Sequence, residues 1–404
     1  MKPRERVMLA LDHREADRIP IDLGGSIVSS ITEKAYRDVK EHLGLPLEDV
    51  RVYDEVQQLP FLTDDLLERF GVDTRMVQLP PTHVSGVEIL DDGHYWAFYD
   101  RWGAKLRMPK ENGFYYDWVE FPIKEISLQA LDAYRWPSPD PVEVVATLRD
   151  QARYLYENTD YALIGSGIIG GGVFEQPCRT VGLENFMMAM ITDRPFAERL
   201  MDGITEIYIA SVERYLDQVG EYIQVFTFWD DLSTQDGWMI SPDLYASLIK
   251  PRQRRLFEAI KRRTRAKLFY HCCGAASELY PHLIEIGVDI VNPVQVSARG
   301  MDPRTLKERF GKDLVFWGGG VDTQRVLPFG SREQVRDEVK RRIDDFAPGG
   351  GFVFAAVHNV QALVPPENIV AIYDTALEHG AYSRCGEMSG PSLGASGGSA
   401  GEGA

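Results

Sequence analysis

Ile223-Gln-Val-Phe-Thr-Phe-Trp229 is a short apolar run, and it is followed by a long helical pattern over Pro242–Arg263 and then by Lys267-Leu-Phe-Tyr-His271-Cys-Cys-Gly274. Both apolar runs have the length and the aromatic and β-branched content of buried strands. Two buried strands on either side of a helix predict a parallel sheet, because parallel neighbours need a long crossover connection. This segment therefore predicts an α/β protein.

The same alternation of apolar run and helix continues through most of the chain. We expect further strands at Tyr161–Gly165, Val288–Asn292, Leu314–Trp317, Phe352–Ala356, Ile19–Leu23 and Val50–Tyr53. We expect further helices at Pro3–Leu11, Leu128–Tyr134, Val142–Asn158, Glu184–Val219, Ala275–Gly287, Arg332–Phe346 and Pro366–His379. About eight strands favour a closed (β/α)8 TIM barrel with an N-terminal extension. A doubly wound open sheet is the alternative architecture.

Two segments fall outside this rhythm. Val84 to Met108 alternates apolar and polar residues around Asp91-Asp92-Gly93, which predicts a β-hairpin inserted into the main fold. The stretch 387–404 is rich in Gly, Ser and Ala, and we expect it to be disordered because it has almost no apolar side chains to bury. We therefore expect one barrel domain over residues 1–386.

Composition limits the partners of this protein. With 44 Lys and Arg against 61 Asp and Glu, the net charge is −17, which argues against nucleic acid as the main partner. No apolar run reaches membrane-spanning length, and the first residues do not resemble a signal peptide. The four cysteines, two of them adjacent at Cys272 and Cys273, do not look like a secreted disulfide framework. We therefore expect a cytoplasmic protein whose thiols are free to bind metal.

The clearest chemical signal is His271-Cys272-Cys273-Gly274 at the end of a predicted strand. Side chains alternate faces along a strand, so His271 and Cys273 should point the same way and Cys272 elsewhere. An imidazole and a thiolate at the carboxyl end of a barrel strand are suitable ligands for zinc. The alternative is a buried cysteine pair beside a hydrogen-bonded histidine.

Two other strand ends carry polar residues that would meet this motif at the same rim of a barrel. His358 follows the last predicted strand, and Asp230 and Asp231 follow Ile223–Trp229. We expect His358 as a third metal ligand, and Asp230 or Asp231 as groups that orient substrate or relay protons. The alternatives are a histidine bonded to loop backbone and a helix-entry cap.

Two glycine-rich loops complete the candidate site. Glu175 follows Gly170-Gly171-Gly172, and Asp322 follows Gly318-Gly319-Gly320. Neither loop has a Walker pattern or the glycine spacing of a dinucleotide-binding loop. We therefore favour tight turns as their role, and the alternative is a backbone that approaches the substrate closely.

These motifs resemble the uroporphyrinogen decarboxylase superfamily, and most closely its zinc-dependent methylcobalamin methyltransferases. His271-x-Cys273-Gly274 is similar to the first half of their zinc motif. Further matching stretches are Asp17-Arg-Ile-Pro-Ile-Asp22, Ile240-Ser-Pro-Asp-Leu-Tyr245, Ile249-Lys-Pro251, Trp317-Gly-Gly-Gly-Val-Asp322, Gly350-Gly-Phe352 and Pro365-Pro-Glu-Asn-Ile369. The resemblance covers about residues 1–382.

Two departures from that pattern affect the expected function. His358 stands where the methyltransferases have a second cysteine, so the implied zinc ligands are His271, Cys273 and His358. The decarboxylases have an arginine-rich N-terminal segment for porphyrinogen carboxylates, whereas Ile21–Ser26 contains no arginine here.

The resemblance implies transfer of a methyl group between a small methylated substrate and a corrinoid on a partner protein, with an O-methyl substrate favoured. It implies Asp230 and Asp231 as catalytic groups, and Glu175, Gln235, Asp322 and Asn359 as substrate-binding groups. The alternatives are a decarboxylase or lyase on the same barrel, acting on a small carboxylated substrate, and a corrinoid- or ligand-binding protein without catalysis. The oligomeric state is left open between monomer and homodimer.

Overall fold

A computed structural model describes residues 1–47, 49–79, 87–139, 142–166 and 171–382. The expected disordered tail at 387–404 and the domain end at residue 386 lie outside the described residues, as does the start of the alternating segment at Val84.

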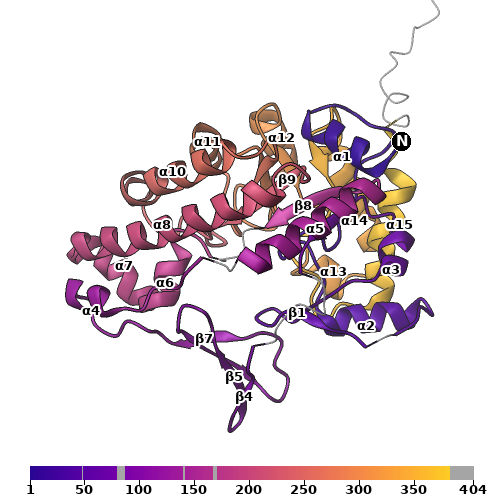
Figure 1. Ribbon diagram of the computed structural model, residues 1–404. Coiled ribbons are helices and arrows are strands. Elements are labelled where there is room, and N and C mark those ends of the chain that lie inside the picture. The colour runs from indigo at the N-terminus through magenta and orange to yellow at the C-terminus, as the bar shows by residue number, and fades with distance from the viewer. Residues whose placement is uncertain (48, 80–86, 140–141, 167–170, 383–404) are drawn as a thin grey trace, which may run out of the picture.

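The centre of the molecule is a parallel sheet of seven neighbouring strands (Figure 1). Their order is β3 (Thr74–Val77), β8 (Ala162–Ser166), β9 (Val225–Trp229), β10 (Lys267–His271), β11 (Ile290–Asn292), β12 (Val315–Trp317) and β13 (Phe352–Val353). His271 stands in register with Trp229 on one side and Asn292 on the other. Because all seven strands run in parallel, their carboxyl ends lie at one edge of the sheet.

The N-terminal segment Pro20–Asp22 closes this sheet. The backbone N–H of Asp22 donates to the carbonyl of Phe354 at 2.8 Å, and the N–H of Phe354 donates to the carbonyl of Pro20 at 2.9 Å. On the other side, the N–H of Asp73 donates to the carbonyl of Ile21 at 2.8 Å. The segment therefore takes the eighth position between β13 and β3, as a TIM barrel requires.

One expected barrel strand is wrong. Val50–Tyr53 corresponds to β1 (Val52–Asp54), which pairs antiparallel with β2 (Leu59–Pro60) outside the barrel. β3 takes the barrel position instead and is buried along its whole length. The polar residues in Thr74-Arg-Met-Val77 made a buried strand hard to predict. Arg75 can be buried because its guanidinium pairs with Asp64 at 2.9 Å and lies 3.6 Å from the centroid of the Tyr161 ring.

The barrel interior is filled by side chains from the strands. Buried residues of this cluster include Ala162, Ile164, Val225, Phe269, Ile290, Val315, Trp317 and Val353. Val7, Ala10 and Leu11 of α1 (Pro3–Leu11) belong to the same cluster. Helix α1 therefore plugs the amino end of the barrel and leaves the carboxyl rim for the site.

Helices form most of the outer layer, and several have the expected bounds. These are α1, α5 (Val142–Asn158), α14 (Arg332–Phe346) and α15 (Pro366–His379), with α4 (Leu128–Ala133) one residue shorter.

Two expected helices are divided in the structure. The expected helix Glu184–Val219 is two helices, α7 (Leu183–Thr192) and α8 (Arg194–Val219), because the Asp193 side chain caps α8 by accepting from the N–H of Phe196. The expected Pro242–Arg263 comprises α9 (Pro242–Leu244), a π-helical turn η1 (Tyr245–Ile249) and α10 (Lys250–Lys261).

The remaining helices are shorter than expected or were not anticipated. The expected Ala275–Gly287 is reduced to α11 (Tyr280–Glu285). The unanticipated helices are α2 (Glu33–His42), α3 (Asp64–Arg69), α6 (Glu175–Val181), α12 (Pro303–Phe310) and α13 (Val326–Phe329). None of the helices in the described ranges is long and apolar enough to cross a membrane.

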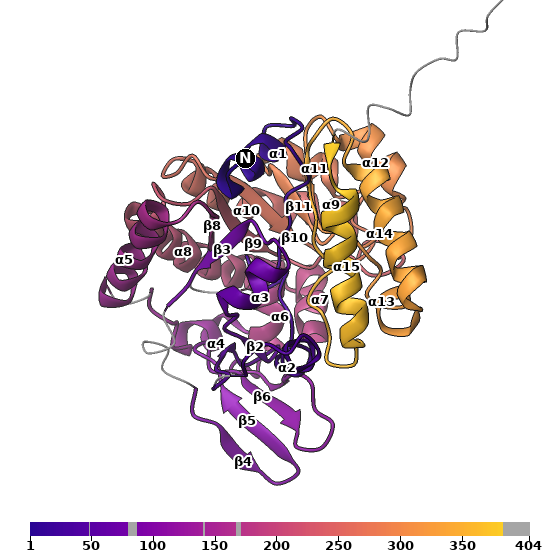
Figure 2. The ribbon, with the colours of Figure 1, turned by 90° about the vertical axis from the view of Figure 1, so that its right-hand side faces the viewer.

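The insertion is larger than the expected hairpin. It is an antiparallel sheet of β4 (Leu90–Asp92), β5 (Tyr95–Tyr99), β6 (Lys105–Pro109) and β7 (Asp117–Glu120). The hairpin at Asp91-Asp92-Gly93 is confirmed as the β4–β5 turn, where Gly93 has a φ of 69° that favours glycine. The sheet projects from the end of the molecule opposite α1 (Figures 1 and 2).

Candidate metal centre and substrate cavity

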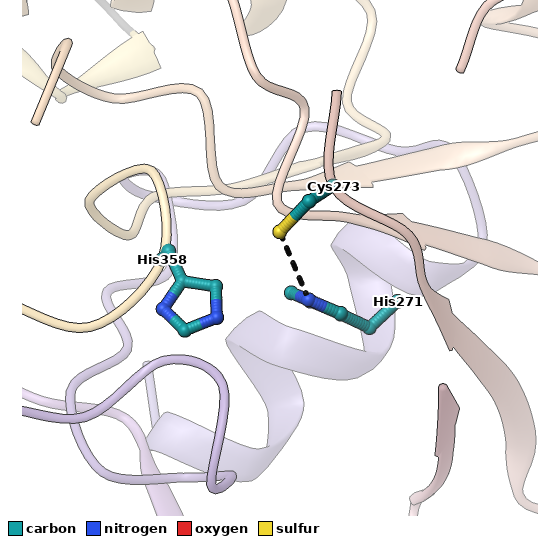
Figure 3. A group of neighbouring side chains, drawn as sticks. All are labelled: His271, Cys273 and His358. Atoms are coloured by element: carbon teal, nitrogen blue, oxygen red, sulfur yellow. Dashed lines mark hydrogen bonds between the residues drawn. The ribbon is translucent and has the colours of Figure 1, made fainter. Parts of the chain in front are cut away.

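His271, Cys273 and His358 converge at the carboxyl rim of the barrel. One potential ligand atom from each lies within 4.8 Å of the others. His271 ends β10, Cys273 follows it, and His358 comes from the loop after β13 on the facing side (Figure 3). The closed barrel therefore joins motifs that are far apart in the sequence.

The His271 imidazole is the most firmly held of the three. Its Nε2 lies 3.3 Å from Sγ of Cys273. Its Nδ1 lies 2.5 Å from Oδ1 of Asn292, at the end of β11. Both His271 and Asn292 are buried.

His358 reaches the same point from a strained backbone. It has a φ of 68°, in the left-handed region that few non-glycine residues adopt. Its Nδ1 accepts a hydrogen bond from the N–H of Asn359 at 2.7 Å. Its ring lies 5.1 Å from that of His271, centroid to centroid. Strain of this kind is typical of functional sites.

Burial changes the pKa of all three side chains. Burial lowers the pKa of His271 to about 4, and burial with the neighbouring His271 lowers the pKa of His358 to about 3. Both imidazoles are therefore neutral at pH 7, as metal ligands must be. Burial, and next the carboxylate of Asp231, raise the pKa of the Cys273 thiol, so without metal it is protonated.

This donor set fits zinc. Two imidazole nitrogens and one sulfur are common zinc ligands, and three protein ligands leave a fourth position for substrate or water. A tetrahedral zinc ion with bonds of about 2.0–2.3 Å holds its ligand atoms roughly 3.3–3.8 Å apart. The 3.3 Å between His271 and Cys273 meets this requirement, and the 4.8 Å limit for the whole set is near it.

Asp231 lies beside the three ligands and faces the open side. Its Oδ1 accepts from the N–H of Cys273 at 2.6 Å and lies 3.9 Å from Nε2 of His271. Burial raises its pKa. Asp231 is thus placed to hold the Cys273 backbone and to hydrogen-bond a group bound next to the ligands.

Asp230 has a different environment. It is fully buried, and its carboxylate accepts from the N–H of Phe174 at 3.0 Å, the N–H of Glu175 at 3.0 Å and Nε2 of Gln253 at 2.9 Å. Burial and the charge of Glu175 raise its pKa to about 7. These contacts make Asp230 an anchor for the start of α6.

The glycine loop before α6 is explained by this anchor. A Cβ on Gly172 would lie 1.8 Å from Oδ1 of Asp230, so only glycine allows the backbone to approach. The same contact holds Glu175 at the site. Gly170, the first glycine of the triplet, lies outside the described residues.

A cavity of about 650 Å³ opens in front of the ligands. His271, His358 and Asp231 form part of its wall, and the inserted sheet and its loops supply another part through Trp102, Tyr115, Tyr116, Asp117 and Trp118. Its wall carries five carboxylates against two guanidiniums, namely Asp54, Asp100, Asp117, Glu175 and Asp231 against Arg101 and Arg179. The cavity is therefore aromatic and acidic.

Glu175 and Arg179 form an ion pair on the cavity wall, at 3.0 Å. The guanidinium of Arg179 also lies over the Trp118 ring, 4.3 Å from its centroid. Oε2 of Glu175 is buried without a hydrogen-bond partner, and burial raises the pKa of this carboxyl group. An unsatisfied buried oxygen is costly unless a ligand or water satisfies it.

Three other expected substrate-binding residues are described, and none of the three is among the residues that line the cavity. Gln235 is exposed. Asp322 accepts from the N–H of Gln324 at 2.8 Å in a local turn. Asn359 accepts from the N–H of Ser30 at 2.6 Å and donates to the carbonyl of Ile27 and to Gln57, each at 2.9 Å. The Asn359 side chain thus ties the His358 loop to Ile27, Ser30 and Gln57.

Sequence reasoning missed Asn292, Arg179 and Trp118. Asn292 had a usable signal, because it is a polar residue at the carboxyl end of a predicted strand, like His271. Arg179 stands four residues after Glu175 in a helix that was not anticipated. Trp118 lies on the inserted sheet, and no local sequence pattern predicts where that sheet packs against the barrel.

Comparison with known families gives a match over most of the chain. The family model for uroporphyrinogen decarboxylase (URO-D) matches residues 101–379. A curated uroporphyrinogen decarboxylase from Geobacter metallireducens is 24% identical over 267 residues, which cover 63% of this chain and 72% of that protein. One from Alkalilimnicola ehrlichii is 25% identical over 291 residues, which cover 68% of this chain and 72% of that protein.

A solved structure has a similar fold along nearly the whole chain. It is described as a methyltransferase from Methanosarcina mazei, with a TM-score of 0.62 and 16% sequence identity. The alignment covers 94% of this chain and 99% of that one. At this identity the likeness establishes the fold.

Proposed function

The chain belongs to the uroporphyrinogen decarboxylase family, and from this premise we propose that it is a zinc-dependent methyltransferase. It would move a methyl group between a small methylated substrate and a corrinoid held by a partner protein. An O-methyl substrate is favoured. A thiol ligand at Cys273 is compatible with a reducing compartment such as the cytoplasm.

The main support for this proposal is the set of three ligand atoms beside the cavity. His271, Cys273 and His358 bring three zinc-type ligand atoms within 4.8 Å of one another, at the rim where a substrate cavity opens. A structural zinc site is usually closed by four protein ligands, whereas a catalytic site keeps one position open. The three-ligand set beside a cavity supports the catalytic kind.

The ion and the side chains around it would have separate tasks. Zinc, when bound, would supply Lewis acidity toward a heteroatom of the methyl donor or acceptor. Asp231 would hydrogen-bond that heteroatom and exchange a proton with it, because its carboxylate lies beside His271 and faces the cavity. The aromatic wall from Trp102 to Trp118 would exclude water and orient the substrate.

The proposed transfer is balanced without an oxidant. In the demethylating direction the bond between methyl carbon and oxygen breaks, and the oxygen keeps the electron pair and takes up a proton. A reduced corrinoid on the partner protein would accept the methyl group and would supply the electron pair for the new bond. The reverse direction would methylate an acceptor.

A decarboxylase of the uroporphyrinogen type is the second candidate, because the curated relatives have that name. Such an enzyme needs cationic groups for several substrate carboxylates. Here carboxylates exceed guanidiniums on the cavity wall, and Ile21–Ser26 brings a buried Asp22 in place of arginines. These observations favour methyl transfer.

Two measurements test the proposal. Metal analysis of protein from zinc-replete cells should give about one zinc per chain. The protein should then catalyse methylation of free cob(I)alamin, used in place of the partner's corrinoid, by at least one compound from a panel of methyl ethers. Metal-free protein, or decarboxylation of uroporphyrinogen with no methyl transfer in either direction, would overturn the proposal.

A further inference from the structure

We propose that Asn292 is the positioning residue of this centre, because it fixes the tautomer and ring orientation of His271 before any metal binds. This inference rests on the metal centre of the proposed function but not on methyl transfer. Asn292 need not touch zinc or substrate, since it would act through His271.

The hydrogen bond itself defines the tautomer. Oδ1 of Asn292 lies 2.5 Å from Nδ1 of His271, with 2% of the Asn292 surface and 3% of the His271 surface exposed. An amide oxygen can only accept, so Nδ1 of His271 must carry the hydrogen. Nε2 then presents its lone pair toward Cys273, whose Sγ lies 3.3 Å away.

The amide of Asn292 is itself fixed in this orientation. Its Nδ2 donates to the carbonyl of Trp317, in the next strand, at 2.9 Å. If the amide were flipped, an oxygen would face the Trp317 carbonyl and an NH2 group would face His271. The flipped amide could serve His271 only in the other tautomer and would lose the Trp317 hydrogen bond.

The barrel makes this pair possible. His271 and Asn292 stand in register on the neighbouring strands β10 and β11, so their side chains emerge side by side at the rim. The N–H of Cys272 also donates to the Asn292 carbonyl at 2.9 Å. Asn292 therefore holds both the ring of His271 and the backbone that leads to Cys273.

The other histidine is held in the opposite way. Nδ1 of His358 accepts from the N–H of Asn359, so in the neutral ring the hydrogen belongs on Nε2. His358 must change this arrangement to bind a metal through Nε2, whereas His271 need not. The preformed half of the centre is thus His271 with Cys273, and it depends on Asn292.

The test compares two substitutions that separate the two hydrogen bonds of Asn292. Asn292→Asp keeps an oxygen acceptor for His271 and loses the donor to Trp317. Asn292→Leu loses both. The matched control is Asn368→Leu, because Asn368 is equally buried and its Nδ2 donates to the carbonyls of Leu327 and Gly330, and none of these three residues belongs to the ligand set or lines the cavity.

Three readouts are needed for each variant: zinc affinity by competition with a chromophoric chelator, the visible spectrum of the Co2+-substituted protein, and the thermal midpoint. Loss of a hydrogen-bond partner of a metal-bound histidine weakens metal binding roughly 10- to 100-fold. We expect Asn292→Leu to show this loss and an altered cobalt spectrum. We expect Asn292→Asp to lose thermal stability but to keep zinc affinity within about threefold of wild type, and Asn368→Leu to do the same.

Each alternative outcome is informative. Wild-type affinity and cobalt spectrum in Asn292→Leu would overturn the inference. A loss of zinc in Asn292→Asp, or a loss in Asn368→Leu equal to that in Asn292→Leu, would also overturn it, because zinc affinity would then follow general stability. If Asn292→Leu does not fold, Asn292→Ala takes its place, because it also removes both hydrogen bonds, and it is judged by the same readouts. If wild-type protein itself binds no zinc, the proposed function fails first, and the two failures are distinguished.

Discussion

The imidazole rings of His271 and His358 meet edge to face at the barrel rim, with their centroids 5.1 Å apart and their planes inclined at 69°. One ring extends from the end of β10 and the other from a loop after β13, so the chain must close its barrel before they meet. The ligands lie at the rim, whereas the apolar side chains that stabilise the barrel lie in its interior and on α1. Substitution of a ligand residue should therefore remove the metal without unfolding the protein.

Cys273→Ala should remove the metal and leave the fold. We expect zinc to fall from about one per chain to near zero, because two neutral imidazoles alone hold the ion far more weakly than they do with a thiolate. The thermal midpoint without added metal should change by only a few degrees, since Cys273 is partly exposed at the rim. Metal analysis and calorimetry check this. Cys178→Ala, a second half-buried cysteine outside the ligand set, should keep full zinc, and a full zinc content in Cys273→Ala would contradict the assignment.

Uroporphyrinogen should not be a substrate. Its several carboxylates would enter a cavity in which carboxylates outnumber guanidiniums, and Arg179 is already paired with Glu175. Incubation with uroporphyrinogen under reducing conditions should yield no coproporphyrinogen by chromatography. The Geobacter metallireducens relative, assayed in parallel, provides the positive control. Efficient stepwise decarboxylation by this protein would show that the charge of the wall has been misjudged.

Stability should rise with pH through the deprotonation of Lys307, whose Nζ donates to the carbonyl of Gly350 at 2.5 Å. Burial lowers its pKa from 10.5 to about 8 in the folded protein. Between these two values the unfolded chain binds more protons than the folded one, so folding becomes more favourable as pH increases. From pH 7.5 to 9.5 the free energy of unfolding should gain about 1 to 2 kcal/mol from this group.

Lys307→Met is the variant that isolates this contribution. Urea unfolding at the two pH values should show a larger increase for wild type than for the methionine variant. Lys312→Met serves as a control, because Lys312 is exposed and should leave the pH dependence unchanged. Equal increases in wild type and Lys307→Met would show that the Lys307 ammonium is well solvated in the folded state.

The parts of this fold that could be predicted from sequence are those in which local pattern and burial agree. β9 and β10 are apolar runs on either side of a helix, and they were located to within two residues. β3 was missed because Arg75 made it look exposed, and only the distant partners Asp64 and Tyr161 account for that burial. The Val50–Tyr53 run had the right composition but lacks a parallel neighbour on either side.

The candidate site also contains residues that could be predicted from sequence and residues that could not. His271, Cys273 and His358 were selected by their chemistry at strand ends, and the closed barrel brings them together as expected. Of the two acids after β9, only the structure distinguishes Asp231, which faces the cavity, from Asp230, which anchors α6. The expected substrate-binding role of Asn359 stays a prediction, and in the structure its side chain hydrogen-bonds Ser30, Ile27 and Gln57. Such hydrogen bonds join residues from opposite ends of the chain, and no local pattern records them.

The histidine at position 358 should determine which substrate atom the centre prefers. Two imidazoles and one thiolate leave a zinc ion with one net positive charge, whereas one imidazole and two thiolates would leave it neutral. The more positive ion is the stronger Lewis acid and favours harder oxygen ligands, so oxygen donors should react better than thiols. In His358→Cys we therefore expect zinc to be retained while demethylation of a methyl ether falls by about tenfold or more, a barrier increase of about 1.4 kcal/mol.

The measurement is methyl transfer to cob(I)alamin from methyl ethers, set against methyl transfer from methylcobalamin to small thiols, for both proteins. The ratio of the two rates should move toward thiols in His358→Cys, because the added thiolate softens the ion. His379→Cys is the matched control, since His379 ends α15 and lies outside the ligand set. Its ratio should equal that of wild type. If wild-type protein methylates thiols rapidly and reacts with no oxygen or nitrogen donor, the charge argument has selected the wrong class of ligand, even though the zinc site itself would stand.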